Sequence, residues 1–211
     1  MAIEVEAKLR ADGPAALATL ASIAAIGRAS LGPAITVDEV DRYLDTEGGA
    51  LAAARWACRL RERGGEIRVS LKGPRAIGDT KGGLHRRPEV EGPATLVPDP
   101  SAWPASEARD RLVALARGAP LRERLRLRQR RTERAVAVDG TPLGTLTLDV
   151  VAIEADGRTA GDLHVVELEL DPGSTDEAVL AEIAADLASM PGLTPEPMTK
   201  LEHALERLAG R

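Results

Sequence analysis

Charged or polar residues alternate with apolar ones in seven short segments of the chain, as they do in half-buried β-strands. The first segment, residues 2–10, places Glu4, Glu6, Lys8 and Arg10 on one face of a strand and apolar residues on the other. The polar faces of the other six segments are formed by Arg55, Arg59 and Arg61; Arg68, Ser70 and Lys72; Arg87, Glu89 and Glu91; Arg126, Arg128 and Arg130; Thr145, Thr147 and Asp149; and Glu167 and Glu169.

Helices are expected between and after these strands. Their patterns cover residues 14–26, 106–117, 176–190 and 199–208, and Thr199 is the expected N-cap of the last one. The stretch 73–83 is rich in Gly and Pro and is the loop expected to move most. Its Lys81 is predicted either to be solvated or to close over a bound phosphate.

The charged faces differ from the outer face of an ordinary antiparallel sheet, which mixes small polar and charged residues. Here some strands carry carboxylates and others carry Arg or Lys. A single strand of this kind fits a solvated outer face equally well. Seven together favour one closed barrel, with its charges inward and its apolar faces outward beneath the helices. This inverts the usual small barrel, and it requires a wet interior with a charged ligand because unpaired charges are costly in a dry core.

Composition narrows the class of protein. The 211 residues carry a net charge of −5, which disfavours nucleic acid as a partner, although an Arg-rich run at 122–134 keeps that alternative open. Cys58 is the only cysteine, so no disulfide forms within the chain. No signal peptide or membrane-spanning stretch is recognisable, and we expect a cytoplasmic protein with one domain over 1–211. The oligomeric state stays open, a homodimer included.

The charged faces also indicate what the barrel binds. Carboxylates grouped without His or Cys suit hard cations such as Mg²⁺ or Mn²⁺, and the three His residues lack zinc-site spacing. Arg and Lys on neighbouring strands suit phosphate oxygens. A cavity with both sets fits a metal-chelated polyphosphate, and neutralisation of its charge is what phosphoryl transfer requires.

These residues also form motifs in a characteristic order. They are Glu4-x-Glu6-x-Lys8, Asp41-x-Tyr43-x-Asp45-Thr46, Arg59-x-Arg61, Val69-x-x-Lys72, Arg87-x-Glu89-x-Glu91, Leu148-Asp149, Glu167-x-Glu169 and Thr199-Lys200-x-Glu202. The first motif alone occurs by chance, but the ordered set spans residues 4–202. It resembles the CYTH superfamily, also called the triphosphate tunnel metalloenzymes.

The resemblance implies an α+β fold with a closed eight-stranded antiparallel β-barrel, or tunnel, open or partly plugged at one end. The carboxylates implied to hold or orient Mg²⁺ or Mn²⁺ are Glu4, Glu6, Asp149, Glu167 and Glu169. The cations implied to bind phosphate are Lys8, Arg59, Arg61, Lys72, Arg87 and Lys200, to which we add Arg126, Arg128 and Arg130. Catalytic roles fall to Glu4, Glu6, Lys8 and Tyr43, although Tyr43 fits a wall residue equally well.

One departure from the family concerns the water-activating base. Some members carry Lys-x-Arg on the strand that reads Arg128-Gln129-Arg130 here, and Arg is a poor proton acceptor. The base therefore stays unassigned. Glu89 and Glu91 are expected either as metal ligands or as partners of the arginines. Asp41 and Asp45 are expected as structural partners of the tunnel arginines.

The family includes inorganic, thiamine and RNA triphosphatases and class IV adenylate cyclases, which share the triphosphate site. Recognition of a base or thiazolium ring usually involves aromatic stacking. This chain offers Tyr43 on the expected inward face, whereas Trp56 should point outward and Trp103 lies in a loop. We therefore expect an undecorated substrate, either tripolyphosphate or a nucleoside triphosphate held by its phosphates. The alternatives are a cyclase, a thiamine triphosphatase and a non-catalytic polyphosphate-binding module.

Overall fold

The structure is a computed structural model that describes residues 2–75 and 84–210. Lys81 and most of the loop predicted at 73–83 lie outside the described residues. No helix in the described part of the chain is long and apolar enough to cross a membrane.

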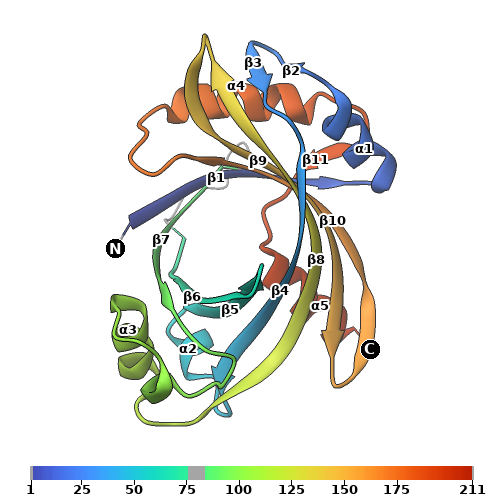
Figure 1. The fold of residues 1–211 in the computed structure, drawn as a ribbon. Helices are drawn as coiled ribbons and strands as arrows, with labels where there is room; N and C mark the ends of the chain where they lie inside the picture. The colour runs from blue at the N-terminus through green and yellow to red at the C-terminus, as the bar shows by residue number, and fades with distance from the viewer. Residues whose placement is uncertain (1, 76–83, 211) are drawn as a thin grey trace.

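Eight antiparallel strands of the described chain close into a barrel, which confirms the predicted fold (Figure 1). Around the barrel they follow the order β8 (Leu121–Val138), β4 (Ile35–Thr46), β5 (Ala57–Arg63), β6 (Glu66–Lys72), β7 (Leu84–Pro93), β1 (Ala2–Ala11), β10 (Arg158–Leu170) and β9 (Thr141–Ala155). The ring closes because β9 pairs with β8 as well as with β10.

Short elements extend this ring. The strands β2 (Ala25–Ile26) and β3 (Ala29–Leu31) form a hairpin on the edge of β8, and β11 (Leu193–Pro195) pairs with β1. A 3₁₀ turn, η2, covers Pro100–Ala102. The pairing of β11 with β1 matters for the site, because it places the chain that leads to the last helix next to the first motif.

Two apolar cores lie between the outside of the barrel and its helices. The helices α1 (Pro14–Ser22) and α4 (Glu177–Ala188) cover the outward faces of β1, β9 and β10. The helices α2 (Ala50–Ala53) and α3 (Glu107–Ala116) cover β5, β6 and β7 on the opposite side, as Figure 1 shows. Trp56 packs against this second core, so it points outward as expected.

The last helix, α5 (Lys200–Ala209), departs from the predicted arrangement of helices on the outside. It packs on inward-facing apolar side chains at one end of the barrel, where it forms a third core. The buried barrel residues of that core are Tyr43, Leu125, Leu127, Val151, Ile153, Ala160, Leu163 and Val165. One end of the barrel is therefore filled with apolar side chains, and the charged faces lie beyond it.

Candidate active site

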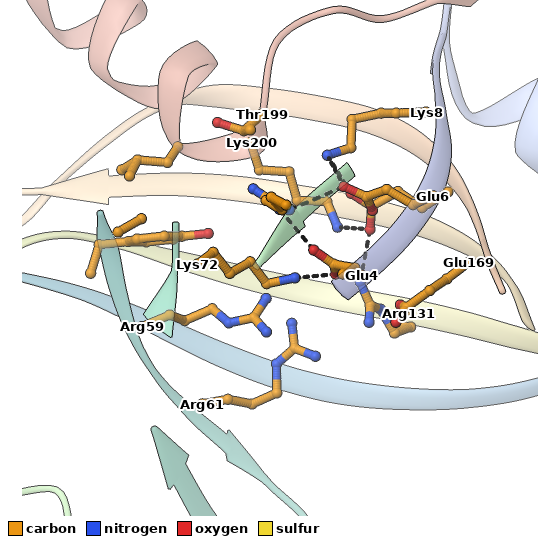
Figure 2. Close-up of a pocket in the computed structure, with 15 residues that line it drawn as sticks. Glu4, Glu6, Lys8, Arg59, Arg61, Lys72, Arg131, Glu169, Thr199 and Lys200 are labelled. Atoms are coloured by element: carbon orange, nitrogen blue, oxygen red, sulfur yellow. Dashed lines mark hydrogen bonds and ion pairs between the residues drawn. The ribbon is translucent and has the colours of Figure 1, made fainter. Parts of the chain in front are cut away.

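The charged faces meet in an inner cavity, and the first turn of α5 forms part of its wall (Figure 2). Within the described chain, seven cations line it: Lys8, Arg59, Arg61, Lys72, Arg87, Arg131 and Lys200. Four carboxylates line it with them: Glu4, Glu6, Glu167 and Glu169. Except for Arg131, every one of these charged residues is a predicted site residue, and Tyr43 also lines the cavity as predicted.

Glu4 is the centre of the first charge cluster. It pairs with Lys72, and its Oε2 accepts a hydrogen bond from Arg87 Nε at 2.7 Å. Burial opposes ionisation of Glu4, but the charges of Lys72 and Arg87 outweigh it and hold its pKa well below the usual range. Arg87 also donates to Glu6 Oε1 at 3.0 Å. The guanidinium therefore bridges two carboxylates that alternate along β1.

Lys8 and Lys200 link the strands β1, β9 and β10. Lys8 Nζ lies 3.1 Å from both Glu6 Oε1 and Glu167 Oε1. Lys200 Nζ lies 2.7 Å from Glu167 Oε2 and 2.5 Å from Asp149 Oδ2. Burial alone would make Glu167 less acidic, yet the charges of Lys200 and Lys8 lower its pKa well below the ordinary value. Glu167 is therefore an anion held between two ammonium groups.

Asp41 holds two arginines of β5, Arg59 and Arg61. Arg61 donates to its two oxygens at 2.8 and 2.9 Å, and Arg59 Nη1 lies 3.4 Å from Oδ2. This confirms the expected structural role of Asp41. The expectation for Asp45 is wrong, because its carboxylate accepts hydrogen bonds from the backbone N–H groups at the start of α2. Arg59 Nε is buried without a hydrogen-bond partner in the described chain.

The predicted placement of Arg126, Arg128 and Arg130 inside the barrel is wrong. Arg126 pairs with Glu123, Arg128 pairs with Glu154, and Arg130 is exposed on the outer face of β8. The inward side chains of this strand are the alternate ones, which begin with Leu125 and Leu127 in the α5 core. The prediction assigns the charged face of β8 to the inside of the barrel. It fails because the apolar face of β8 points inward at the filled end.

Sequence analysis also missed Arg131 and Gln129, which follow the two leucines on the inward face. Arg131 donates to Asp149 Oδ1 and Oδ2 at 2.8 Å each and lies 3.3 Å from Glu167. Gln129 Nε2 donates to Asp41 Oδ2 at 2.6 Å. Two successive arginines, Arg130 and Arg131, face opposite sides of the strand. The signal that separates them is the continuation of the leucine alternation.

Asp149 lies behind the cavity wall. It is fully buried, and its oxygens are bound by Arg131 and Lys200, whose charges outweigh the cost of burial and lower its pKa. Glu89 likewise has partners, because it accepts from Ser70 at 2.9 Å and pairs with Lys72 at 3.3 Å. Both carboxylates are therefore placed to orient cations that line the cavity.

Glu169 is the exception among the carboxylates of the cavity. No hydrogen bond or ion pair reaches its side chain from the described residues, and Glu6 lies opposite it on β1. Glu169 is an exposed residue. Desolvation of its carboxylate by the protein around it and the charge of Glu4, with smaller contributions from Glu6 and Glu89, outweigh the charge of Lys72 and raise the pKa of Glu169 to about 7. Like charges held opposite one another destabilise a strand pair unless a cation separates them.

Glu4, Glu6, Glu167 and Glu169 supply the oxygen-only donors that Mg²⁺ or Mn²⁺ prefers. In the described residues, no three or more His, Cys, Asp or Glu side chains are already grouped as a metal site. Three of these four carboxylates are instead paired with Lys or Arg. The donor chemistry therefore fits a hard divalent cation, and Glu169 is the carboxylate most available to it.

Charge changes along the barrel. The inner cavity has a volume of only about 70 Å³, because the ion pairs fill most of the space. It continues past Glu4, Arg59, Arg61, Lys72 and Glu169 into a wider mouth of about 940 Å³. Among the described residues, the further charged side chains that line this mouth are acidic, namely Glu89, Glu91, Glu107, Asp171 and Glu177, of which Glu91, Glu107 and Glu177 also pair with arginines. The mouth is therefore more acidic than the inner cavity.

Comparison with known proteins agrees with this architecture. The sequence model of the CYTH domain matches residues 2–204, so the chain belongs to the CYTH domain family. No curated protein sequence matches it. One similar solved structure is a proposed adenylyl cyclase from Hippeastrum, described as having a dominant triphosphatase activity. The two chains share 18% identity, with a TM-score of 0.64 over 99% of this chain and 96% of the other.

Two further solved structures share the fold. One is a proposed adenylate cyclase from Bacillus halodurans, with 19% identity and a TM-score of 0.60 over 96% of this chain and 98% of the other. The other is the PH1819 protein from Pyrococcus horikoshii, with 18% identity and a TM-score of 0.52 over 96% and 99%. At these identities, the similarity shows a common fold.

Proposed function

We propose that this protein is a divalent-metal-dependent triphosphatase that binds its substrate inside the barrel and acts on inorganic tripolyphosphate. The observation that carries the proposal is that seven cations and four carboxylates of the described residues converge on one inner cavity. An ion-pair network of this size costs more to desolvate than an apolar barrel core. A site that binds a polyanion together with a cation accounts for it, and membership of the CYTH domain family supports the same activity.

The cations from β5, β6 and β7, together with Lys200 of α5, are proposed to bind the phosphate oxygens. Arg59 and Arg61 present guanidinium groups that Asp41 holds from behind, and Arg can contact a phosphate with two parallel hydrogen bonds. In the structure, Lys72 and Arg87 pair with Glu4. When substrate binds, a phosphate group is proposed to replace this carboxylate as their partner. Binding therefore exchanges one set of ion pairs for another within the small cavity.

The carboxylates of β1 and β10 are proposed to hold the metal. Glu6 and Glu169 face one another across the strand pair, with Glu4 and Glu167 beside them. Bound Mg²⁺ or Mn²⁺ neutralises charge on the phosphoryl group and makes a water more acidic. When Lys72 and Arg87 bind phosphate, Glu4 and Glu6 lose cationic partners and become available as ligands of the metal ion.

Tyr43 is proposed to form the wall of the cavity and not to act as a base. Its ring belongs to the apolar core beneath α5, and burial raises the pKa of its hydroxyl further above neutrality. A phenol that stays protonated at pH 7 is a poor proton acceptor. Gln129 and Arg131 on the facing strand are not proton acceptors either.

Two observations favour tripolyphosphate over larger substrates. Tyr43 is the only aromatic residue that lines the cavity among the described residues, and it lies at the filled end. The acidic mouth would repel the remainder of a long polyanion. A short triphosphate places its charge among the cations and leaves little in the mouth.

A substrate panel tests this assignment. Purified protein would be assayed with tripolyphosphate, ATP, thiamine triphosphate and long-chain polyphosphate, each with Mg²⁺ and with Mn²⁺. We expect the highest kcat/KM for phosphate release from tripolyphosphate. Formation of cyclic AMP from ATP without hydrolysis of tripolyphosphate would instead identify a cyclase. Binding of polyphosphate without turnover of any substrate would identify a binding module.

A further inference from the structure

Lys200 reaches the cavity from the first position of α5, whereas the other six lining cations project from barrel strands. Figure 2 shows Thr199 and Lys200 beside the wall that carries Lys8. A strand side chain is positioned by its ladder of hydrogen bonds, but the place of Lys200 depends on how the helix begins. The segment 196–199 therefore determines where this ammonium group lies.

Thr199 begins the helix with a capping box. Glu202 N donates to Thr199 Oγ1 at 3.1 Å, and Thr199 N donates to Glu202 Oε2 at 2.7 Å. Such a box fixes the direction of the first turn. It does not fix the helix relative to the barrel, so a second set of contacts has to anchor the segment that precedes it.

The side chain of Glu196 makes those contacts, and it is buried. Its Oε1 accepts from Met198 N at 2.9 Å, before the cap. Its Oε2 lies 2.8 Å from His203 Nε2, one turn after the cap. One carboxylate therefore joins the segment before Thr199 to the first turn of α5, with Lys200 between its two attachment points.

The backbone of Glu196 is tied to the barrel beside the charge network. Its N–H donates to the carbonyl oxygen of Lys8 at 2.9 Å. Its carbonyl oxygen accepts from His85 Nε2, also at 2.9 Å, and the His85 side chain is buried. Lys8 and Lys200 both bind Glu167, so Glu196 is fixed to the strand that carries the other ammonium group of the pair.

We propose that Glu196 is a positioning residue that holds Lys200 against the triphosphate site through its contacts with Met198 and His203. Its carboxylate does not line the cavity and needs no contact with substrate. Without it, the box at Thr199 still starts a helix and the apolar face of α5 still packs on the barrel, but the first turn loses its side-chain tie to the segment before it and can shift relative to the cavity. Lys200 then binds phosphate less well while the other six cations stay in place. The inference rests on the proposed function, because it requires that Lys200 contact the ligand.

A double-mutant cycle tests the inference through binding alone. Tripolyphosphate binding would be measured by calorimetry with EDTA for wild type, Glu196→Ala, Lys200→Ala and the double variant. We expect Glu196→Ala to weaken binding about tenfold, comparable with the loss of one charge-assisted contact. In the Lys200→Ala background the same substitution should change affinity less than about twofold, because contacts in one network are not additive.

Matched variants separate positioning from a general loss of stability. Arg207→Ala removes a different anchor of α5, its 2.7 Å hydrogen bond to the carbonyl oxygen of Asp162, and should leave affinity within about twofold. Glu196→Gln keeps the acceptor for Met198 N and should restore most of the affinity. If Glu196→Ala does not fold, His203→Ala replaces it in the cycle, since it removes one contact and leaves the other.

Two results would overturn the inference. Equal losses from Glu196→Ala with and without Lys200 would show that Glu196 acts independently of it, and wild-type affinity in Glu196→Ala would show no role. If wild type neither binds tripolyphosphate nor hydrolyses it with Mg²⁺ or Mn²⁺, the proposed function fails together with the inference. Binding by wild type with an additive cycle contradicts the positioning role alone.

Discussion

Glu6 on β1 lies directly opposite Glu169 on β10, so two carboxylates are held side by side on the wall of the barrel. Gly144 allows the neighbouring strand to approach closely there, because a Cβ at this position would lie 1.9 Å from the carbonyl oxygen of Glu169. The register of β1 and β10 thus holds two acidic residues next to one another, and the charge of Glu4 adds to the repulsion felt by Glu169. A divalent cation between the two would turn that repulsion into ligation, which explains why a strand would keep this arrangement.

Glu169→Gln should therefore stabilise the metal-free protein and abolish its metal-dependent turnover. The pKa of Glu169 is raised from an ordinary value of 4.5 to about 7, so the folded protein binds a proton there that the unfolded chain releases between these pH values. The repulsive cost is then larger at pH 8 than at pH 5.5. We expect urea denaturation to show a stability advantage of Glu169→Gln over wild type at pH 8 that shrinks at pH 5.5.

A stability advantage that does not depend on pH would contradict this account of Glu169. So would full metal-dependent phosphate release by the variant. Glu91→Gln provides a control, because Glu91 also lies at the mouth but pairs with Arg68 at 3.5 Å on an exposed edge. It should leave the pH dependence of stability close to that of wild type.

Arg130 and Arg131 form a matched pair for the orientation of β8. Arg131→Ala removes a partner of buried Asp149 and should cost about 3 kcal/mol in the free energy of unfolding. It should also weaken tripolyphosphate binding. Arg130→Ala removes an exposed side chain and should change stability by less than about 0.5 kcal/mol. Urea denaturation would measure the stability of both variants, and calorimetry their affinity for tripolyphosphate. A larger effect of Arg130→Ala would mean that Arg130, and not Arg131, points into the barrel.

Tyr43→Phe distinguishes a wall residue from a catalyst. The ring packs in the α5 core, so the variant should fold as wild type does. We expect kcat within about threefold of wild type, whereas loss of a general base or acid reduces rates by about a hundredfold or more. Steady-state kinetics with tripolyphosphate would distinguish the two roles. A hundredfold fall in kcat with unchanged KM would show that Tyr43 is catalytic.

The acidic mouth predicts discrimination between short and long polyanions. Glu91→Lys should raise the rate on long-chain polyphosphate relative to tripolyphosphate by about three- to tenfold at low salt. The gain should diminish at high ionic strength, because exposed charges are screened. A ratio that does not respond to the charge of residue 91 would show that the mouth does not select by length.

The sequence was sufficient to predict the barrel and most of its charged lining, because polar alternation reports which side chains share a face. On β1 and β10 the polar face is also the inward face, so Glu4, Lys8 and Glu167 were placed correctly. On β8 the same reasoning failed, since Leu125 and Leu127 are the inward residues. Alternation identifies two faces but does not show which of them points inward.

The position of α5 could not be predicted for a related reason. Its pattern predicts an amphipathic helix and its cap, but an apolar helical face packs equally well on the outside of a barrel or within its end. Tertiary pairing decides this, through β11 on β1 and through the ion pairs of Lys200. The role of Asp45 was likewise hidden, because capping of α2 uses backbone N–H groups that leave no trace in side-chain patterns.

The rate of phosphate release from tripolyphosphate, measured as Mg²⁺ is titrated into the wild-type protein, shows whether the charged cavity is a metal-dependent active site. We expect no release in EDTA, a rate that rises and saturates with Mg²⁺, and a loss of about a hundredfold or more in Glu6→Gln. A rate that does not depend on metal would contradict the role given to the carboxylates. Saturable tripolyphosphate binding with no release at any Mg²⁺ or Mn²⁺ concentration would contradict the proposal that the protein is an enzyme.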